Sequence, residues 1–393
     1  MKTMKWKFYS LAFVAGMSIL TACSSDDNND NDGNGGNGNG NEIENGTILK
    51  GTITSDVTLA AGNTYKLSGE YIVEEGATLH IEEGVKIIAV YDDIADYILV
   101  KQGGKINAVG TPDKPIVMTS EKEEPGAWGG IHICRRAHTN AEGGKGSSEI
   151  GGAVYGGNDD ADNSGTLQYI RLEYTGFAFD EEHEANGISF YGVGNGTIVD
   201  HCQAYKGSDD GFEFFGGSVN VSNLVAVSCS DDSFDWTEGW NGKGTNLVAY
   251  QEAESTLGYD CDCLMECDNN GSNNAATPVA HPVLKNLILV GNGGSKQGIR
   301  LRAGTEVEID NAKVCGKGQP LTVETALTEN ALKNGTSKLT NITLTSELSC
   351  KEGIYTHADF IAVTSNKVDA NLSYSSFEDI KKECSWMNGS WVK

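Results

Sequence analysis

The residues that decide the fold form a short phrase that recurs through the second half of the chain. It reads NLVAV at 223–227, NLVAY at 246–250 and NLILV at 286–290, with looser copies at 311–314, 341–344 and 371–374. The leading Asn residues of these copies are 23, 40, 25, 30 and 30 positions apart. Within each copy, apolar residues alternate with other positions, a period of two that indicates a β-strand.

A second strand phrase follows each copy of the first after a turn. It reads GFEF at 211–214, SFDW at 233–236, GYDC at 258–261 and GIRL at 298–301, and it also fits 187–190, 320–323 and 353–356. Two strand phrases in a fixed order predict one solenoid coil per repeat, with like phrases of successive coils paired in parallel. Helical stretches of ten or more residues are missing between the phrases, so βαβ repeats are not expected.

The matching letters of the first phrase predict two ladders along the solenoid. Inward apolar residues such as Leu224, Leu247 and Leu287 should stack in the core. The repeated Asn predicts an amide ladder at a bend, with each side chain bonded to the coils on either side. The N-terminal half fits the same scheme more loosely, with strand phrases at 71–81, 97–100, 105–108, 115–120 and 126–133.

Several segments resemble one widespread group of proteins. They are GAWGGI at 126–131, NSGTLQYIRLEY at 163–174, DDGFEFFGG at 209–217 and DDSFDWTEGW at 231–240. They are similar to pectate-lyase-like β-helix proteins and lipoproteins secreted by Gram-negative bacteria. The resemblance covers roughly residues 50–345 and implies an all-β chain folded as a right-handed parallel β-helix. It implies no reaction, because that family has no established activity.

The N-terminal residues predict export and lipid anchoring. Residues 1–7 carry three lysines, 8–20 are mostly apolar, and Leu-Thr-Ala precedes Cys23. This pattern predicts a signal peptide at 1–22 and lipidation of Cys23. Residues 23–46 are polar and predict a disordered tether, leaving 47–393 as one β-helix domain with a C-terminal cap that includes a helix near 375–382. Acidic residues directly after Cys23 resemble the signal for the outer face of the outer membrane, so we expect cell-surface display.

Charge and cysteine content restrict the partners and the redox state. The formal net charge of −26 predicts repulsion from nucleic acid, while remaining compatible with divalent cations and with neutral or cation-bridged ligands. Removing Cys23 leaves nine cysteines, three of them at 261, 263 and 267. An exported chain in an oxidising compartment is expected to pair some of them as disulfides and keep a free thiol.

Aligning the second phrases predicts a column of outward charged residues. Glu213, Asp235 and Asp260 fall at one position, with Arg300 on the next coil. Neighbouring coils lie about 4.8 Å apart, so these side chains should be close. The preceding turns carry a second stacked set, namely Asp209, Asp210, Asp231 and Asp232.

This acidic column supports three interpretations. The carboxylates bind Ca²⁺, which prefers oxygen ligands. Alternatively, Glu213, Asp235 and Asp260 supply an acid and a base for a glycoside hydrolase, or Arg300 supplies the base of a polysaccharide lyase. In the third interpretation the acids are solvated turn residues of a structural or adhesive solenoid.

The residues near the column complete the predicted surface. Tyr191 and Trp240 follow second phrases and are expected to stack on sugar rings, with Glu238 beside them, whereas Phe214 and Trp236 should be core. The Gly-rich segment 135–162 is expected to be an insertion whose Asp159, Asp160 and Asp162 hold a cation. The sequence thus predicts a surface lipoprotein that binds carbohydrate or another extracellular polymer, with Ca²⁺ as the expected ion.

Overall fold

A computed structural model describes residues 41–92, 94–179 and 183–393 of the chain. The predicted signal peptide, Cys23 and most of the predicted tether lie outside these residues. Residues 41–46 were assigned to the tether, but β1 (Asn41–Glu42) already pairs with β3 (Val57–Leu59) of the first coil. No helix in the described ranges is long and apolar enough to cross a membrane.

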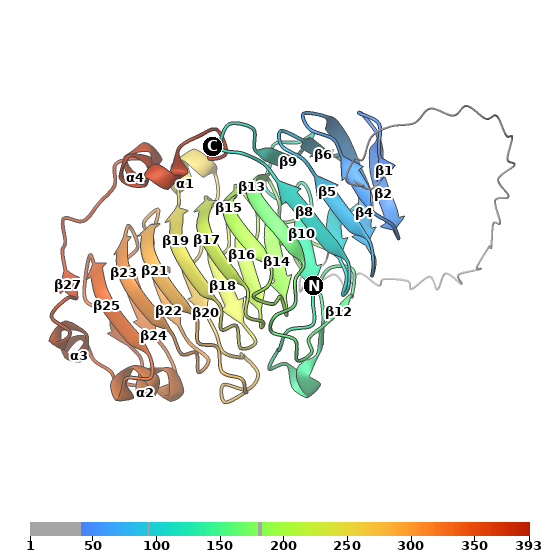
Figure 1. Cartoon of the computed structure of the whole chain (residues 1–393). Helices are drawn as coiled ribbons and strands as arrows, with labels where there is room; N and C mark the ends of the chain where they lie inside the picture. The colour runs from blue at the N-terminus through green and yellow to red at the C-terminus, as the bar shows by residue number, and fades with distance from the viewer. Residues whose placement is uncertain (1–40, 93, 180–182) are drawn as a thin grey trace, which may run out of the picture. The chain divides into compact units, whose positions relative to one another are not determined.

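The described chain is a parallel β-helix with three faces, and its coils stack in chain order from β1 to β27 (Figure 1). One face, here called the groove face, is built from the second phrases. Its strands are β7 (Tyr97–Val100), β10 (Ile131–Cys134), β14 (Ile188–Tyr191), β16 (Phe212–Phe215), β18 (Phe234–Thr237), β20 (Met265–Cys267), β22 (Gln297–Leu301), β24 (Gln319–Val323) and β26 (Ser349–Cys350).

The first phrases form the other two faces, because each long strand turns a corner in its middle. These strands are β13 (Gly165–Glu173), β15 (Ile198–Tyr205), β17 (Asn220–Val227), β19 (Lys243–Tyr250), β21 (Val283–Val290), β23 (Glu308–Cys315) and β25 (Lys338–Leu344). Residues 165–168 of β13 pair with β8 (Lys105–Val109), and residues 170–172 pair with β9 (Ile116–Ser120). In the first coils these places are filled by β5 (Thr78–Ile81) and β6 (Lys86–Ala89), and in the last coil by β27 (Lys367–Val368). The strands β2 (Ile48–Ile53) and β4 (Thr64–Val73) turn a different corner, because residues 64–67 of β4 pair with β6 and residues 70–73 pair with β7 of the groove face.

The corner of each long strand is the predicted asparagine position. Asn223, Asn246, Asn286 and Asn311 have φ between 55° and 63°, a left-handed conformation that Asn adopts more readily than most residues. The Nδ2 of each of the last three donates to the Oδ1 of the preceding Asn at 2.8, 3.0 and 2.8 Å. The predicted amide ladder is therefore confirmed over these four coils.

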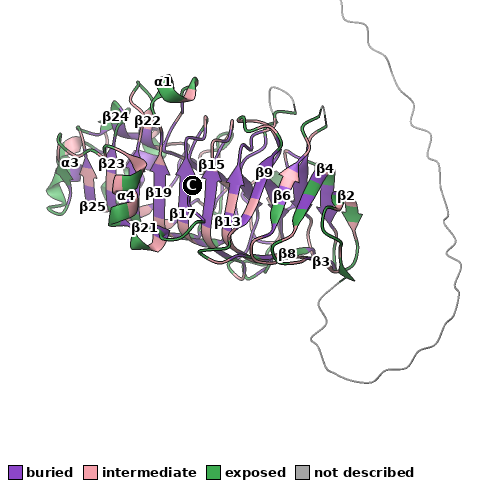
Figure 2. Cartoon of the chain, turned by 90° about the horizontal axis from the view of Figure 1, so that it is seen from above, coloured by how far each residue is buried: buried purple, intermediate pink, exposed green. Residues whose placement is uncertain are grey.

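The predicted core ladder is also confirmed. Leu224 pairs directly with Leu247, and Leu247 with Leu287, and all three side chains are buried. Under the groove face, Phe190 stacks on Phe214 with ring centroids 5.0 Å apart. Buried residues run along the strands, whereas exposed residues lie mainly in turns and helices (Figure 2).

The last residues of the chain do not close the end of the solenoid as predicted. Residues 369–393, here called the C-terminal strap, contain α4 (Phe377–Glu383) and a 3-10 turn (Ser385–Met387). They cover the outer side of the third face, which is formed by the C-terminal halves of the long strands. There Ile380 and Trp391 pack against Val225, Val248 and other outward apolar residues. These outward apolar residues explain why the segment packs along the side of the solenoid and does not cap its end.

Short helices and three mispredicted strands, one of them at 258–261, mark the later coils. The helices are α1 (Glu254–Leu257), α2 (Ala326–Asn334) and α3 (His357–Ala362). The copies of the phrases at 353–356 and 371–374 are not strands, because the last pairings use β26 and β27 instead.

Candidate functional site

An outward column on the groove face carries the predicted charges. Strand pairing places Ser189 beside Glu213, and Glu213 beside Asp235. Beyond Asp235 the column continues as Glu266, Arg300 and Thr322. Side chains alternate along each strand, so these residues face outward while Phe212, Phe214, Phe234 and Trp236 face the core.

Asp260 was predicted in this column, and that prediction is wrong. The coil that leaves β19 is longer than its neighbours and contains α1, so the next strand begins at Met265. Glu266 therefore occupies the position assigned to Asp260. Asp260 lies in the turn, where it accepts hydrogen bonds from its neighbour Cys261 and from Asn292. The 40-residue spacing between Asn246 and Asn286 was the available signal of the longer coil.

The turns before these strands form a second ladder. Asp210 Oδ1 accepts the backbone N–H of Asp232 at 2.8 Å, and Asp232 Oδ1 accepts that of Cys263 at 2.6 Å. Asn186 Oδ1 accepts the N–H of Asp210 one coil earlier, at 3.2 Å. One oxygen of each of these Asp side chains therefore joins successive coils, which leaves the other oxygen for a neighbouring group.

The column and the turns together line a cavity of about 430 Å³, here called the acidic groove. Its lining consists of ten carboxylate residues and one arginine: Glu149, Glu184, Asp209, Asp210, Glu213, Asp231, Asp232, Asp235, Asp262, Glu266 and Arg300. Glu149, Glu184, Asp262 and Glu266 were not among the predicted residues. Glu149 and Glu184 come from loops outside the repeat, so no phrase alignment could have placed them.

Overlapping sets of three carboxylates lie close enough to share an ion. Within each set, one oxygen per residue lies within 4.8 Å of the other two. The sets are Asp209–Asp210–Asp231, Asp210–Glu213–Asp235 and Asp232–Asp235–Glu266. Asp235 belongs to two sets, and its Oδ1 is buried without a hydrogen-bond partner among the described residues.

Burial and like charge raise the pKa values of these acids. The pKa of Glu213 lies well above its usual range because the carboxyl is desolvated and because Glu149 and Asp235 are near. The pKa of Asp235 is raised in the same way, by burial and by the nearby Glu266. Burial and Asp231 raise the pKa of Asp209 to about 7. Each shift means that the ionised form of these carboxyls is less favoured than that of an exposed carboxyl, and a nearby positive charge would oppose the shift.

The protein neutralises only one end of the groove. Arg300 bonds Glu266 at 2.8 Å and Glu324 at 3.1 Å, and Arg302 bonds Glu266 and also Asp268 at 2.7 Å. Among the described residues, no Lys or Arg forms an ion pair with Asp209, Asp210, Glu213, Asp231, Asp232 or Asp235. Asn186 supplies a neutral partner instead, since its Nδ2 donates to Glu213 at 2.5 Å.

These contacts do not favour Arg300 as a lyase base. Both of its carboxylate partners favour the protonated guanidinium and outweigh the opposing effect of burial, so its pKa lies above the ordinary arginine value. A base must release its proton before it can accept one from a substrate. Arg300 therefore acts as a fixed positive charge at the edge of the groove.

The predicted aromatic platform is absent from the described surface. Trp240 is 1% exposed and stacks on Phe214 with centroids 4.1 Å apart, because the chain turns inward after Gly239. Tyr191 is also 1% exposed, and its hydroxyl donates to Glu149 at 3.3 Å. Phe214 and Trp236 are core, as expected.

The segment 135–162 is an insertion that covers the first half of the groove face. It carries a short hairpin of β11 (Gly146–Ser147) and β12 (Val154–Tyr155), and Tyr155 packs on Tyr191. Its acids do not form the predicted cation site, because Asp162 is paired with Arg135 and Asp160 with His138. The insertion instead sets one wall of the acidic groove through Glu149.

The nine described cysteines are free thiols. The expected disulfides are therefore not present among them. Eight of the nine are buried, and burial raises the pKa of Cys229 and of Cys261 to about 12. Thiols that remain protonated at neutral pH react slowly, so these cysteines serve as small core residues.

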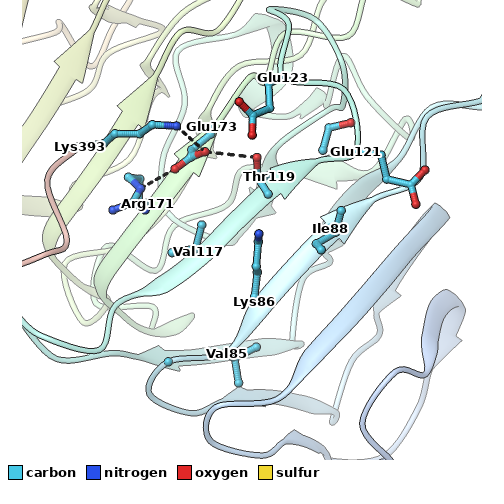
Figure 3. A pocket seen from close by; sticks show the side chains of 12 residues that line it. Val85, Lys86, Ile88, Val117, Thr119, Glu121, Glu123, Arg171, Glu173 and Lys393 are labelled. Carbon is cyan, nitrogen blue, oxygen red and sulfur yellow. Dashed lines mark hydrogen bonds and ion pairs between the residues drawn. The ribbon is translucent and has the colours of Figure 1, made fainter.

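A different cavity, of about 650 Å³, lies beside the end of the C-terminal strap (Figure 3). Its central acid, Glu173, accepts from Arg171 at 2.6 Å, from Lys393 at 3.1 Å and from Thr119 at 3.3 Å. These charges satisfy one another within the protein. The acidic groove is therefore the better candidate for a ligand site.

Comparison with known proteins gives one family. A model described as a pectate-lyase like beta helix domain matches residues 51–393. Comparisons with curated proteins and with solved structures gave no match.

Proposed function

The chain belongs to the pectate-lyase-like β-helix family, and from this premise we propose that it binds an acidic polysaccharide through divalent cations held in the acidic groove. The family supports a carbohydrate-related role for the solenoid. The remaining part of the proposal rests on the groove itself.

The observation that carries the proposal is the set of overlapping carboxylate triads, in which Glu266 alone has an arginine partner among the described residues. Ca²⁺ takes six to eight oxygen ligands at roughly 2.3–2.6 Å. Three carboxylates satisfy only part of that requirement, and the remaining positions suit the carboxylate and hydroxyl oxygens of a uronic acid. An anionic polymer would otherwise be repelled by the ten acids of the lining.

Calcium binding alone is the first test. Thermal unfolding is followed in EDTA and in excess Ca²⁺, for the wild type, for Asp235→Asn, and for Glu254→Gln, which changes an exposed acid on α1. A ligand that binds only the folded state at about 100 times its Kd stabilises by about 2.7 kcal/mol. We expect such a rise for the wild type and for Glu254→Gln, and a much smaller one for Asp235→Asn. An equal stabilisation of all three proteins by Ca²⁺ would show that the ion does not bind in this groove.

Polysaccharide binding is the second test. Polygalacturonate is titrated calorimetrically against the same proteins, with Ca²⁺ or with EDTA. We expect binding only with Ca²⁺, and loss of binding in Asp235→Asn. Binding that survives chelation would contradict the cation bridge.

Lipid anchoring at the cell surface is also part of the proposal, and its support is the leader sequence at 1–22, which directly precedes Cys23. We expect radiolabelled palmitate to be incorporated into the wild type and not into Cys23→Ser. Protease added to intact cells should degrade the wild-type protein if it is displayed outside.

A further inference from the structure

A second polar cavity lies on the groove face beside the acidic groove. It measures about 700 Å³ and is here called the amide pocket. Its lining residues are Asn140, Ala141, Glu142, Thr237, Glu238, Asn270, Gly271, Ser272 and Asn273. They come from the insertion, from the end of β18 and from the loop that follows β20.

Hydrogen bonds between these three segments fix the floor of the amide pocket. The Asn140 backbone N–H donates to Glu238 O at 3.0 Å, and its side chain donates to Asn269 Oδ1 at 2.8 Å and to Pro278 O at 2.9 Å. Asn270 Nδ2 donates to Asn140 Oδ1 at 3.0 Å. The pocket is thus preformed, which lowers the entropy cost of binding.

Glu238 is held so that one of its oxygens remains available. Thr139 Oγ1 and the Tyr155 hydroxyl both donate to Oε2, at 2.6 and 2.8 Å. Among the described residues, no donor reaches Oε1. The residue also keeps a left-handed backbone, with φ of 54°, which is uncommon for a non-glycine residue. Glu238 was predicted beside an exposed Trp240, whereas the structure places it in this pocket without any aromatic neighbour in the lining.

The composition of the lining selects a neutral polyhydroxylated ligand. Amides and hydroxyls both donate and accept, as vicinal sugar hydroxyls do, and the free Glu238 oxygen accepts from a hydroxyl. The lining contains no Lys, Arg or His to neutralise a carboxylate, sulfate or phosphate. An anionic group would meet Glu238 and Glu142 without compensation.

The position of the pocket sets the direction of a bound chain. Asp235 in the acidic groove and Thr237 in the amide pocket are successive outward residues of β18, roughly 6.6 Å apart along the strand. We infer that the amide pocket is a neutral-sugar subsite anchored by Glu238, so that the bound polymer lies along β18 with a neutral residue next to an acidic one. The acidic half of this inference rests on the proposed function, whereas the amide pocket can be tested without it.

The first experiment addresses the amide pocket alone. Saturation-transfer NMR in EDTA uses methyl glycosides of galactose, glucose, mannose, rhamnose, xylose and N-acetylglucosamine. Glu238→Gln keeps an oxygen for Thr139 and Tyr155 but presents an NH₂ group to the pocket, and Thr237→Val removes a hydroxyl without changing the side-chain shape. We expect at least one glycoside to bind the wild type and Glu254→Gln, with affinity about tenfold lower in Glu238→Gln. The neutral subsite would be overturned if no glycoside bound the wild type, or if Glu238→Gln and Thr237→Val both bound the glycoside as tightly as the wild type does.

The second experiment joins the two cavities. With Ca²⁺ present, rhamnogalacturonan oligomers, which alternate a uronate with a neutral sugar, are compared with oligogalacturonates of equal length. We expect the wild type to prefer the alternating oligomer by about tenfold and Glu238→Gln to lose that preference while still binding oligogalacturonate. Equal affinities in the wild type would overturn the inferred direction. If neither oligomer binds while the glycoside result holds, the proposed function fails and the amide pocket stands.

Discussion

The two ends of the acidic groove show opposite solutions to one electrostatic problem. At the end nearer the C-terminus, Glu266, Asp268 and Glu324 are each paired with Arg300 or Arg302, and Lys351 adds a further contact to Glu324 at 2.6 Å. At the other end, Glu213 and Asp235 are stacked in the same register on neighbouring strands without such a partner among the described residues.

The difference separates structural charge from charge kept for a ligand. Parallel stacking places like residues about 4.8 Å apart wherever acids occupy matching positions, so repulsion is common to both ends. Fixed arginines remove the repulsion permanently, whereas unpaired acids require protons or an exchangeable cation. Among the paired acids, the pKa of Glu324 is lowered because its hydrogen bonds to Lys351 and Arg300 outweigh burial. Burial raises the pKa values of Glu266 and Asp268 in spite of their arginines, and it raises that of the unpaired Glu213.

The largest expected effect comes from removing the arginines. The double variant Arg300→Met, Arg302→Met leaves Glu266 and Asp268 without a basic partner and leaves Glu324 with Lys351 alone, so we expect the free energy of unfolding to fall by about 3 kcal/mol. Guanidinium unfolding followed by tryptophan fluorescence measures this loss, and added Ca²⁺ should recover part of it. Lys296→Met is the control, because its exposed pair with Asp262 should contribute about 1 kcal/mol or less. A double variant that loses no more than this control would contradict the division into two ends.

An intermediate effect is expected from pH in the absence of divalent ions. Asp209 and Glu149 have pKa values raised from 3.8 and 4.5 to about 7, mainly by burial, so between these limits the folded state binds more protons than the unfolded state. The free energy of unfolding in EDTA should therefore fall as pH rises from about 4 to about 7, by about 2 kcal/mol. Calorimetry across this range measures the slope, and saturating Ca²⁺ should flatten it. A free energy of unfolding that rises through the window would show that the paired carboxylates dominate.

The smallest expected effect distinguishes the ends by sign. Glu213→Gln removes repulsion and should raise the free energy of unfolding in EDTA by about 1 kcal/mol. Glu266→Gln deprives Arg300 and Arg302 of a charged partner and should lower it by about 1 kcal/mol. Differential scanning calorimetry of both variants provides the measurement. Shifts of the same sign would mean that register alone, and not the arginines, determines the local electrostatics.

The repeat made the fold and half of the groove predictable. Phrase order and the Asn spacing predicted parallel coils, a bend and the neighbours Glu213 and Asp235, since strand pairing requires only matching positions. Phrase alignment failed where the coil is longer: it assigned Asp260 to the column, whereas Glu266 occupies that position because extra residues separate β19 from β20. The segment at 264–267, LMEC, does carry the same apolar–acid alternation as 212–214 and could have been chosen.

Residues outside the repeat were beyond prediction for a different reason. Glu149 reaches the groove through the insertion, and Trp240 turns inward because the chain reverses at Gly239, which packs against Pro278 and Asn140. Both positions depend on tertiary contacts between segments far apart in the sequence. Burial of an aromatic after a strand has no periodic signature.

The C-terminal strap changes how the stack can come apart. In a solenoid each coil contacts only its neighbours, so end coils can fray one at a time. Here Ser390 donates its backbone N–H to Pro112 O at 2.7 Å, and Arg171 donates to Ser390 O, also at 2.7 Å. The strap leaves the final coil at Asp369, so fraying of that coil would disturb hydrogen bonds that the strap makes many coils away. Local opening is thereby linked to release of the whole face, and the array should melt as a unit rather than unravel from its tip.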